Sequence, residues 1–490
     1  MRGFLGIDLG TSAAKALLLT EAGAVVAKGA ATYPTWSGSG GEVEQSPEDW
    51  WLAVTQATRA CLAAAPAGVS VGGLGFSGHM SVLLPLDAGL APLRPALTVG
   101  DTRGAAEAVA LNEAHGPALA AASGNLALSA FTLAKLAWYR RHEPEAFNRT
   151  RVIVGAKDYL RLRATGSLAA DPTDAGNTLL LDLTTRAWNT SLVERLGFAS
   201  ELLPPLRESF EIAGDLTPDA ADALGLPTGL PVITGMADMA ASVLGAGMLS
   251  SERVAITLGT SGQVTQVVDA PEPALLGRFT YHPHAVPGRA YVMATLFTGG
   301  LGLRWFVDVV ASITGMSNDE ALALVLASAA KAEAGARGVT FLPYLTGSGS
   351  PSFDPGRRAV FHGLGRGHAG ADLSRAVLEG VAFSVRHALD VMAQHHPRGS
   401  EWVAGGGGMR SALWRQITAD ATQRPLRPLL EEDAGPFGTA VAVGHALGAF
   451  GDLQANLAAM VSVGPAIEPS RERAVAYDAV YRRYLRLAEA

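Results

Sequence analysis

The chain has 490 residues, 48% of them apolar and 17% charged, which is enough for more than one folded domain and excludes a disordered chain. The net charge of −7, without a long basic run, argues against nucleic acid as a partner. The single cysteine, Cys61, permits no internal disulfide and is typical of a reducing compartment, so we expect a cytoplasmic protein that does not bind membranes.

The first thirty residues contain three short apolar runs, at 4–9, 16–19 and 24–27, separated by turn-forming residues. This pattern predicts a meander of antiparallel strands. The first run is too short for the core of a signal peptide and is expected to be a buried strand. A helix is expected next, with Ser46 as its N-cap. A strand over 71–78 then leads into a polar loop that contains His79.

The pattern of the first strands begins again near residue 250. Apolar strand runs at 152–157 and 231–235 precede this point, and a second strand–turn–strand pattern covers 253–268. An amphipathic helix is predicted over 371–393, and the uncharged stretch 434–451 is expected to be a small-residue helix inside a core, since it is too weakly apolar for a membrane span. The sequence therefore predicts two α/β domains, 1–248 and 249–490, with a cleft between them.

The tetrapeptide Leu-Gly-Thr-Ser occurs at 9–12 and again at 258–261, once in each predicted domain. A hairpin tip made of glycine and hydroxyl residues exposes backbone N–H groups, and two such tips facing one another can hold a polyphosphate. Asp8, just before the first tip, can hold Mg²⁺ through water. The alternative is that both tips are ordinary turns and that Asp8 caps one of them.

Two further stretches favour the same chemistry. Gly405–Gly408 follow a predicted strand and precede a helix, where a flat ligand or a phosphate can approach the backbone. Asp238 follows a buried strand and opens a helix, a position in which a carboxylate in a phosphoryl-transfer site accepts the proton of the attacking hydroxyl. A flexible turn and a common N-terminal helix acid are the respective alternatives.

Three familiar motifs do not apply. All five lysines follow an alanine, so the chain has no Gly-Lys-Ser/Thr phosphate loop. The match to a dinucleotide fingerprint at 365–370 lacks its βαβ unit, and the match to a nucleophile elbow at 68–72 precedes a strand instead of following one.

With these motifs in place, the chain resembles the FGGY family of carbohydrate kinases, and within it the xylulokinases. GIDLGTS, ITLGTSG, AGGGGMRS and the Asp238 loop are similar to that family's two phosphate loops, adenosine loop and catalytic-base loop. Six more blocks occur in the family's order: EQSPEDWW, FTLAKLAWYRRHEPEAF, KDYLRLRATG, AADPTDAGNTLLLD, FLPYLTGSGSP and FHGLGRGHAGADLSRAVLEGVAFS. The resemblance covers nearly the whole chain.

The resemblance implies two actin/hexokinase-like (ribonuclease H-like) domains that close over ATP, Mg²⁺ and a small sugar. The implied sugar is a ketopentose such as D-xylulose, and the implied product is its 5-phosphate. Asp238 is then the general base and Asp8 the metal-side carboxylate. The implied nucleotide contacts are Gly10, Thr11, Ser12, Gly259, Thr260, Gly299, Gly300, Gly406, Gly407 and Ser411. The implied substrate contacts are His79, Met80, Ser81, Asp101, Arg103 and Asp238 itself.

The sequence departs from xylulokinases mainly on the substrate side. The usual Gln-Met-His reads His79-Met80-Ser81, and only Asp101 and Arg103 remain of Trp-Asn-Asp-Gly-Arg. The Asn that usually follows the base is Met239, and a usual Glu-Arg is Ser348-Gly349. Because a site that has lost a hydroxyl partner binds its sugar poorly, another ketose or a polyol is the alternative substrate.

Two functions without a sugar kinase's turnover also stay open: a catalytically silent ATP- and sugar-binding regulator, and an actin-like ATPase. Retained Asp8 and Asp238 argue against the regulator, and the sugar-kinase blocks outside the nucleotide loops argue against the ATPase. The sequence does not determine the oligomeric state, for which a homodimer is one candidate.

Overall fold

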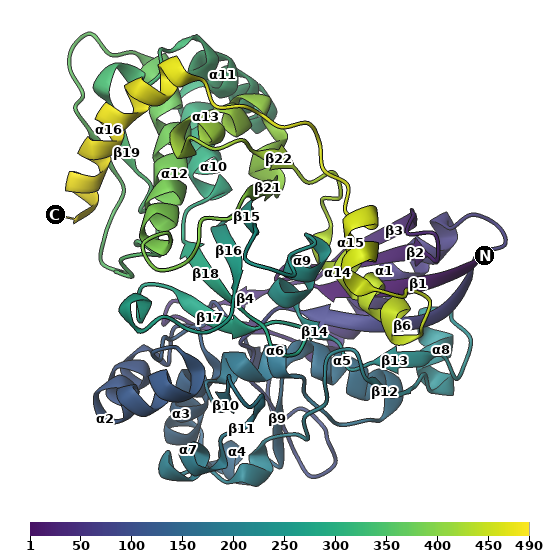
Figure 1. Ribbon diagram of the computed structural model, residues 1–490. Helices are drawn as coiled ribbons and strands as arrows, with labels where there is room; N and C mark the ends of the chain where they lie inside the picture. Colours follow the sequence, from purple (N-terminus) through teal and green to yellow (C-terminus); the bar gives the residue numbers. More distant parts are fainter. Residues whose placement is uncertain (490) are drawn as a thin grey trace.

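Each half of the chain builds its own mixed β-sheet. The computed structural model describes residues 1–489 and contains a seven-stranded sheet followed along the chain by a six-stranded one (Figure 1). The first sheet has the order β12-β13-β6-β1-β2-β3, with β14 also paired to β6. Its strands are β1 (Arg2–Leu9), β2 (Ala13–Thr20), β3 (Val25–Thr32), β6 (Ser70–Gly78), β12 (Ile212–Asp215), β13 (Pro231–Ile233) and β14 (Met236–Ala237).

The second sheet repeats the pairing pattern of the first. Its order is β17-β18-β16-β15-β21-β22, made of β15 (Arg253–Leu258), β16 (Gly262–Val268), β17 (Thr280–Pro283), β18 (Ala290–Leu296), β21 (Glu401–Gly405) and β22 (Arg427–Pro428). In each sheet a hairpin opens an antiparallel meander, and a later strand joins the hairpin's first strand in parallel: β6 joins β1, and β21 joins β15. The predicted meanders and the restart near residue 250 are therefore confirmed.

Helices cover both sheets and extend the two lobes. The first half contains α1 (Pro47–Ala64), α2 (Ala105–Ser123), α3 (Thr132–His142), α4 (Pro144–Arg149), α5 (Ala156–Thr165), α6 (Pro172–Ala175), α7 (Thr190–Arg195), α8 (Pro218–Leu224) and α9 (Asp238–Gly245). The second contains α10 (Gly300–Thr314), α11 (Asn318–Lys331), α12 (Gly370–Met392), α13 (Ala412–Thr422), α14 (Ala434–Ala446), α15 (Leu453–Met460) and α16 (Arg471–Glu489).

In residues 1–489, nine short strands form smaller sheets outside the two large ones. These strands are β4 (Trp36–Ser37), β5 (Val43–Gln45), β7 (Leu84–Leu86), β8 (Ala96–Leu97), β9 (Val152–Val154), β10 (Leu181–Asp182), β11 (Ala187–Trp188), β19 (Thr340–Leu342) and β20 (Val360–His362). Strands β4, β5 and β8 form a three-stranded sheet, and the others pair as β7 with β9, β10 with β11 and β19 with β20.

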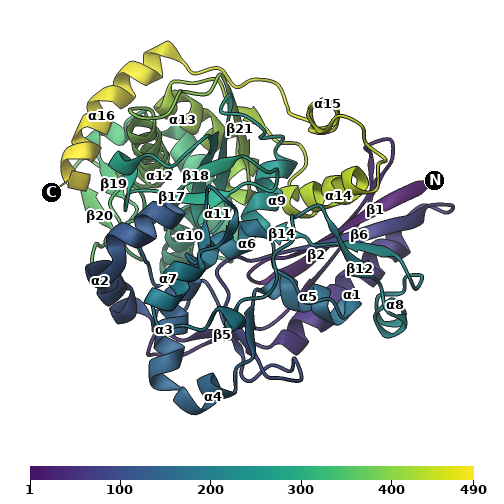
Figure 2. The ribbon, with the colours of Figure 1, turned by 60° about the horizontal axis from the view of Figure 1, so that its bottom comes forward.

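Helices α9 and α14 lie between the two sheets (Figures 1 and 2). They share one hydrophobic cluster with Phe4 of β1 on one side and with Tyr291 and Val403 of the second sheet on the other. Two further clusters form the separate cores of the first and second sheets. Because α14 follows the second sheet in sequence but packs on β1, the last third of the chain helps to hold both halves together.

Two local predictions were wrong in detail. Ser46 precedes α1 as expected, but its side chain makes no capping hydrogen bond. His79 lies in the loop directly after β6, as predicted, but its side chain is only 1% exposed, because β6 lies inside the sheet.

Residues 434–446 of the stretch 434–451 form a buried helix, α14, so the predicted helix is confirmed except for its last five residues. Within residues 1–489, no single helix is long and apolar enough to cross a bilayer. Helices α10 and α11, which meet at a sharp bend, together have the length and apolar composition of a membrane span.

Candidate active site

The second Leu-Gly-Thr-Ser copy is the tip of the β15–β16 hairpin, and a glycine pair packs against it. The N–H of Gly300 donates to the carbonyl of Gly259 at 2.6 Å, and the N–H of Gly299 donates to that of Thr260 at 3.0 Å. A Cβ on Gly299 would lie 2.4 Å from the carbonyl oxygen of Ser261, so only glycine fits there. The tip is thus held by backbone contacts, and the side chain of Thr260 stays exposed.

The first copy is the equivalent tip of the β1–β2 hairpin. The side-chain amide of Gln45 donates to the carbonyl of Thr11 at 2.9 Å, and the hydroxyl of Tyr33 donates to that of Gly10. The side chains of Thr11 and Ser12 are exposed. In both tips carbonyls are occupied by the protein, and the exposed hydroxyls of Thr11, Ser12 and Thr260 can meet a ligand, whereas that of Ser261 accepts from the side-chain amide of Gln263 at 2.8 Å.

Both hairpins border one cavity between the sheets, with a volume of about 170 Å³. Asp8 and Lys15 of the first hairpin line it, together with Thr257 of the second and the end of β21 at Gly405 and Gly406. The lining also includes residues 431–436, at the start of α14. Thr11 and Thr260 do not line the cavity. The hairpin residues that do are those of the strands next to the two tips, among them Asp8, Lys15 and Thr257.

Asp8 is a half-buried carboxylate at the end of β1. It accepts a hydrogen bond from the hydroxyl of Ser77 at 2.7 Å, and the hydroxyl of Thr439 lies 2.9 Å from that of Ser77. Burial raises the pKa of Asp8 above its usual value, although Ser77 and Lys15 act to lower it. Ser77 therefore orients one oxygen of a carboxylate that faces the cavity.

The donor set around Asp8 fits Mg²⁺ carried by a nucleotide better than a permanently bound ion. Among residues 1–489 no three His, Cys, Asp or Glu side chains gather as they would around a resident metal ion. Mg²⁺ in phosphoryl-transfer sites is usually held by one or two carboxylates together with phosphates and waters. Asp8, a carboxylate that faces the cavity, meets that requirement.

Asp238 is the first residue of α9, and its carboxylate accepts a hydrogen bond from the backbone N–H of Met239 at 2.7 Å. The backbone of Met80 lies close enough to act to lower the pKa of Asp238. Burial, followed by the negative charge of Asp8, raises the pKa of Asp238 to about 8. The structure therefore brings Asp238, Asp8 and Met80 of the predicted site into one neighbourhood. A carboxyl group with so high a pKa is a strong base once it is ionised.

The segment after β6 lies beside Asp238. The ring of His79 is buried against the edge of Trp50, 5.6 Å away between centroids, and neither of its nitrogens has a hydrogen-bond partner. Burial and then the charge of Lys135 lower the pKa of His79 to about 4, so the ring is neutral at pH 7. Ser81 has a positive φ of 64°, and its carbonyl accepts from the ammonium of Lys135 at 3.1 Å.

Asp101 and Arg103 form a buried ion pair. Arg103 donates to Asp101 at 2.6 Å and lies over the ring of Trp138, 4.3 Å from its centroid. Asp101 also accepts from the N–H of Val43 at 3.0 Å, and its side chain is not exposed. These bonds occupy both groups within the protein, and their predicted contact with a sugar hydroxyl stays a prediction.

The glycine run after β21 packs against Leu258, the first residue of the second tip. Gly406 has a φ of 86°, and a Cβ there would lie 2.7 Å from the carbonyl oxygen of Leu258, whereas a Cβ on Gly407 would meet nothing within 4 Å. Ser411 caps α13 by accepting from the N–H of Trp414 at 3.3 Å. Gly406 is thus required by the approach of β15, and Gly407 borders open space suited to a flat ligand.

The positions that depart from xylulokinases have structural partners. Met239 packs at the edge of the hydrophobic cluster between the sheets. The hydroxyl of Ser348 donates to the carbonyl of Ser352 at 2.8 Å, and a Cβ on Gly349 would lie 1.9 Å from the carbonyl oxygen of Thr295. A side chain at position 349 would therefore require the backbone to move.

Two groups near the site were missed by sequence reasoning. Asp433 lies 2.8 Å from Lys15 across 418 residues of chain, and Thr173 bonds to the residue before Asp238. No local pattern signals either contact, because each depends on segments that only the fold brings together.

The chain matches known proteins over most of its length. Residues 4–245 match the N-terminal domain, and residues 254–447 the C-terminal domain, of the FGGY family of carbohydrate kinases. A xylulose kinase of Escherichia coli (strain K12) is 38% identical over 443 residues, which cover 88% of this chain and 87% of that protein.

Solved structures agree with this match. The crystal structure of xylulose kinase from Rhodospirillum rubrum has a TM-score of 0.89 at 30% identity, covering 99% of this chain and 98% of that one. The crystal structure of gluconate kinase from Lactobacillus acidophilus has a TM-score of 0.91 at 25% identity, covering 100% and 98%. The predicted boundary at 248/249 falls between the two domain matches, and the domain limits stay a prediction.

Proposed function

The chain belongs to the FGGY family of carbohydrate kinases, and from this membership we propose that it transfers the γ-phosphoryl group of ATP to D-xylulose, giving the 5-phosphate. The sugar kinase activity and the use of ATP with Mg²⁺ are those of the family. The choice of sugar is supported by xylulose kinases of 30–38% identity that align with most of the chain.

The observation that carries the mechanism is the neighbourhood of Asp238. In the proposed reaction its carboxylate accepts the proton of the sugar's 5-hydroxyl as the oxygen attacks the γ-phosphorus and the bond to the β-phosphate oxygen breaks. The hydrogen bond from the N–H of Met239 orients the carboxylate, and the backbone of Met80 lies beside it. The segment that contains Met80 would then bind the sugar and position its 5-hydroxyl beside Asp238.

The nucleotide would lie along the cavity between the two hairpins. The tips at Thr11 and Thr260 are suited to its phosphates and the open glycine run at Gly407 to its adenosine, while Asp8 would hold Mg²⁺. The metal ion, when bound, supplies neutralisation of the phosphate charge. Closure of the two halves over this cavity would exclude water, which competes with the sugar as acceptor.

A second acceptor is favoured by a specific similarity. The gluconate kinase structure superposes as well as the xylulose kinase structure does, so the fold serves sugars of different chemistry. Together with Ser81 in place of the usual histidine, this makes another ketose or a polyol the second candidate substrate.

Measuring ADP release with D-xylulose, D-ribulose, gluconate and glycerol tests the proposal. We expect the highest kcat/KM with D-xylulose, and a loss of about 10²–10⁴ in kcat for Asp238→Asn with ATP binding retained. Asp215→Asn, an exposed aspartate at the end of β12, is the matched control and should behave like the wild type. If folded, ATP-binding protein is inactive with every acceptor, the kinase assignment is contradicted. An active Asp238→Asn enzyme would contradict the assignment of Asp238 as the base.

The cytoplasmic location and a homodimer stay predictions.

A further inference from the structure

A buried chain of hydrogen bonds ends at the peptide immediately before Asp238. The hydroxyl of Thr173, at the start of α6, accepts from the N–H of Ala237 at 2.8 Å and donates to a carboxylate oxygen of Asp171 at 2.6 Å. Thr173, Asp171 and Ala237 are all fully buried. Since a buried N–H without a partner is costly, this hydroxyl determines where the Ala237 peptide lies.

Asp171 is itself held in place from the other side. The same carboxylate oxygen accepts from the hydroxyl of Ser209 at 2.7 Å, and the other oxygen lies 2.9 Å from the ammonium of Lys157. Lys157 also lies 2.6 Å from Asp158 and is not exposed. Buried charges that satisfy one another in this way tolerate little displacement, so the Thr173 oxygen occupies a rigid position.

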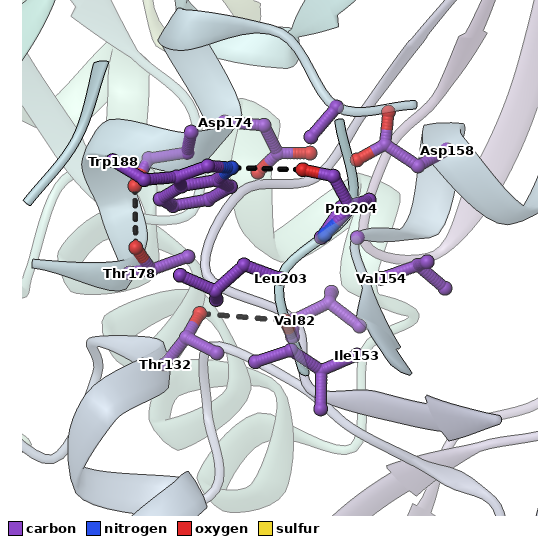
Figure 3. A pocket seen from close by; sticks show the side chains of 13 residues that line it. Val82, Thr132, Ile153, Val154, Asp158, Asp174, Thr178, Trp188, Leu203 and Pro204 are labelled. Atoms are coloured by element: carbon purple, nitrogen blue, oxygen red, sulfur yellow. Dashed lines mark hydrogen bonds between the residues drawn. The ribbon is translucent and has the colours of Figure 1, made fainter. Parts of the chain in front are cut away.

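The charged cluster has no room for a substrate. Figure 3 shows Asp158 and Asp174 at one wall of the adjoining cavity, with Thr132 and Ile153 at the opposite wall. The cavity has a volume of only about 20 Å³. That is close to the minimum for a single water molecule and far below the size of a sugar. The cluster therefore acts on the protein itself.

Strand β14, which precedes Asp238, is held in the sheet without the bond from Thr173. Strand β14 already pairs with β6, Met236 opposite Ser77 and Ala237 opposite Gly78. The bond from Thr173 falls on the last residue of β14, directly before α9 begins. It therefore acts on the angle and position at which the helix, and with it the Asp238 carboxylate, leaves the strand.

We propose that Thr173 is a positioning residue for Asp238: its hydroxyl, fixed by Asp171 and Lys157, holds the Ala237 peptide so that the carboxylate meets the acceptor hydroxyl. The inference rests on the proposed role of Asp238 as the base. Misplacement of a reacting group by about 1 Å can lower a rate by about 10²-fold, which makes the effect measurable.

Thr173→Val tests the proposal, because valine keeps the shape of threonine but neither accepts from Ala237 nor donates to Asp171. We expect kcat to fall by about 10–100-fold with KM for sugar and ATP changed by less than about threefold. Thr173→Ser restores the hydroxyl and should bring kcat back to within about threefold of the wild type.

The matched control is Thr165→Val. The hydroxyl of Thr165 also donates once, to the carbonyl of Arg161 at 2.8 Å, and accepts once, from the N–H of Ser167 at 3.1 Å, but it does not touch the base segment. This variant should lose less thermal stability than Thr173→Val, because the Thr165 hydroxyl is half-buried and bonds only to backbone groups, and it should keep its kcat within about twofold. If Thr173→Val loses stability while its kcat stays at the level of the control, the role is structural and the proposal is overturned.

Two further comparisons keep the outcomes distinct. Should Thr173→Val not fold, Thr173→Ala and Thr173→Ser form the same pair, and equal kcat values for the two would overturn the proposal. Asp238→Asn is assayed alongside: an active Asp238→Asn enzyme would refute the proposed base, whereas an inactive one beside an unaffected Thr173→Val enzyme would refute only the positioning role.

Discussion

A single carboxyl group, Asp238, combines properties that seldom occur together. It is half-buried, and it lies close enough to Asp8 for the two charges to interact. The backbone N–H of Met239, at 2.7 Å, and the nearby backbone of Met80 favour its ionised form. The balance leaves its pKa at about 8, with burial as the largest cause. At neutral pH a large part of the ligand-free protein therefore carries Asp238 protonated.

The pH dependence of the reaction follows from this pKa. A base must be ionised to accept a proton, so kcat/KM for the sugar should rise with pH and reach half of its maximum near pH 8. Initial rates between pH 6 and pH 9.5 measure this limb. The residual activity of Asp238→Asn should lack it, and a wild-type profile that is flat over the same range would argue against Asp238 as the titrating base.

At the scale of elements, small residues let two helices and a strand approach closely at the site. A Cβ on Gly438 of α14 would lie 2.1 Å from the carbonyl oxygen of Ala241 in α9, and a Cβ on Gly6 of β1 would lie 2.0 Å from that of Pro436. Helix α9 begins with Asp238, and Asp8 is the penultimate residue of β1. The glycines thus bring the base and the metal-side carboxylate onto adjacent elements.

Gly438→Ala should separate α14 from α9. Because the neighbour is backbone and cannot swing away, we expect the free energy of unfolding to fall by about 1–3 kcal/mol, together with a decrease in kcat. Urea denaturation and steady-state kinetics measure the two effects. Gly451→Ala is the control, since a Cβ there meets nothing within 4 Å. Equal unfolding midpoints for the two variants would show that the helices absorb the methyl group.

For the molecule as a whole, ion pairs across the cavity join the first sheet to the segment before α14. Asp433 lies 2.8 Å from Lys15 and 3.1 Å from Lys28, and Lys28 also pairs with Glu431. Burial acts to raise the pKa of Asp433, but the two lysines outweigh it and the pKa is lowered. These pairs bring opposite charges from the two ends of the chain to the rim of the proposed phosphate site.

Asp433→Asn should strengthen the binding of ATP. The substitution removes a negative charge beside the cavity and frees Lys15, so we expect a decrease in Kd of about threefold to tenfold at 50 mM NaCl and less at 300 mM, because salt screens half-exposed charges. Isothermal titration calorimetry measures both. Asp215→Asn is the control of equal charge change, since Asp215 is an exposed residue of β12 and does not line the cavity. Weaker binding by Asp433→Asn would mean that Asp433 itself contributes to the nucleotide site.

The sequence by itself determined the two-sheet α/β organisation, the hairpin tips at 9–12 and 258–261, and the family. These follow from local strand and turn patterns and from blocks in a fixed order, which neighbouring residues are enough to specify. Only the tertiary structure decided that α14 packs on β1, that Asp101 is occupied by Arg103, that His79 is buried, and that Thr173 and Asp433 reach the site. Such contacts join residues tens to hundreds of positions apart, and they arise from packing and burial, which no local pattern encodes.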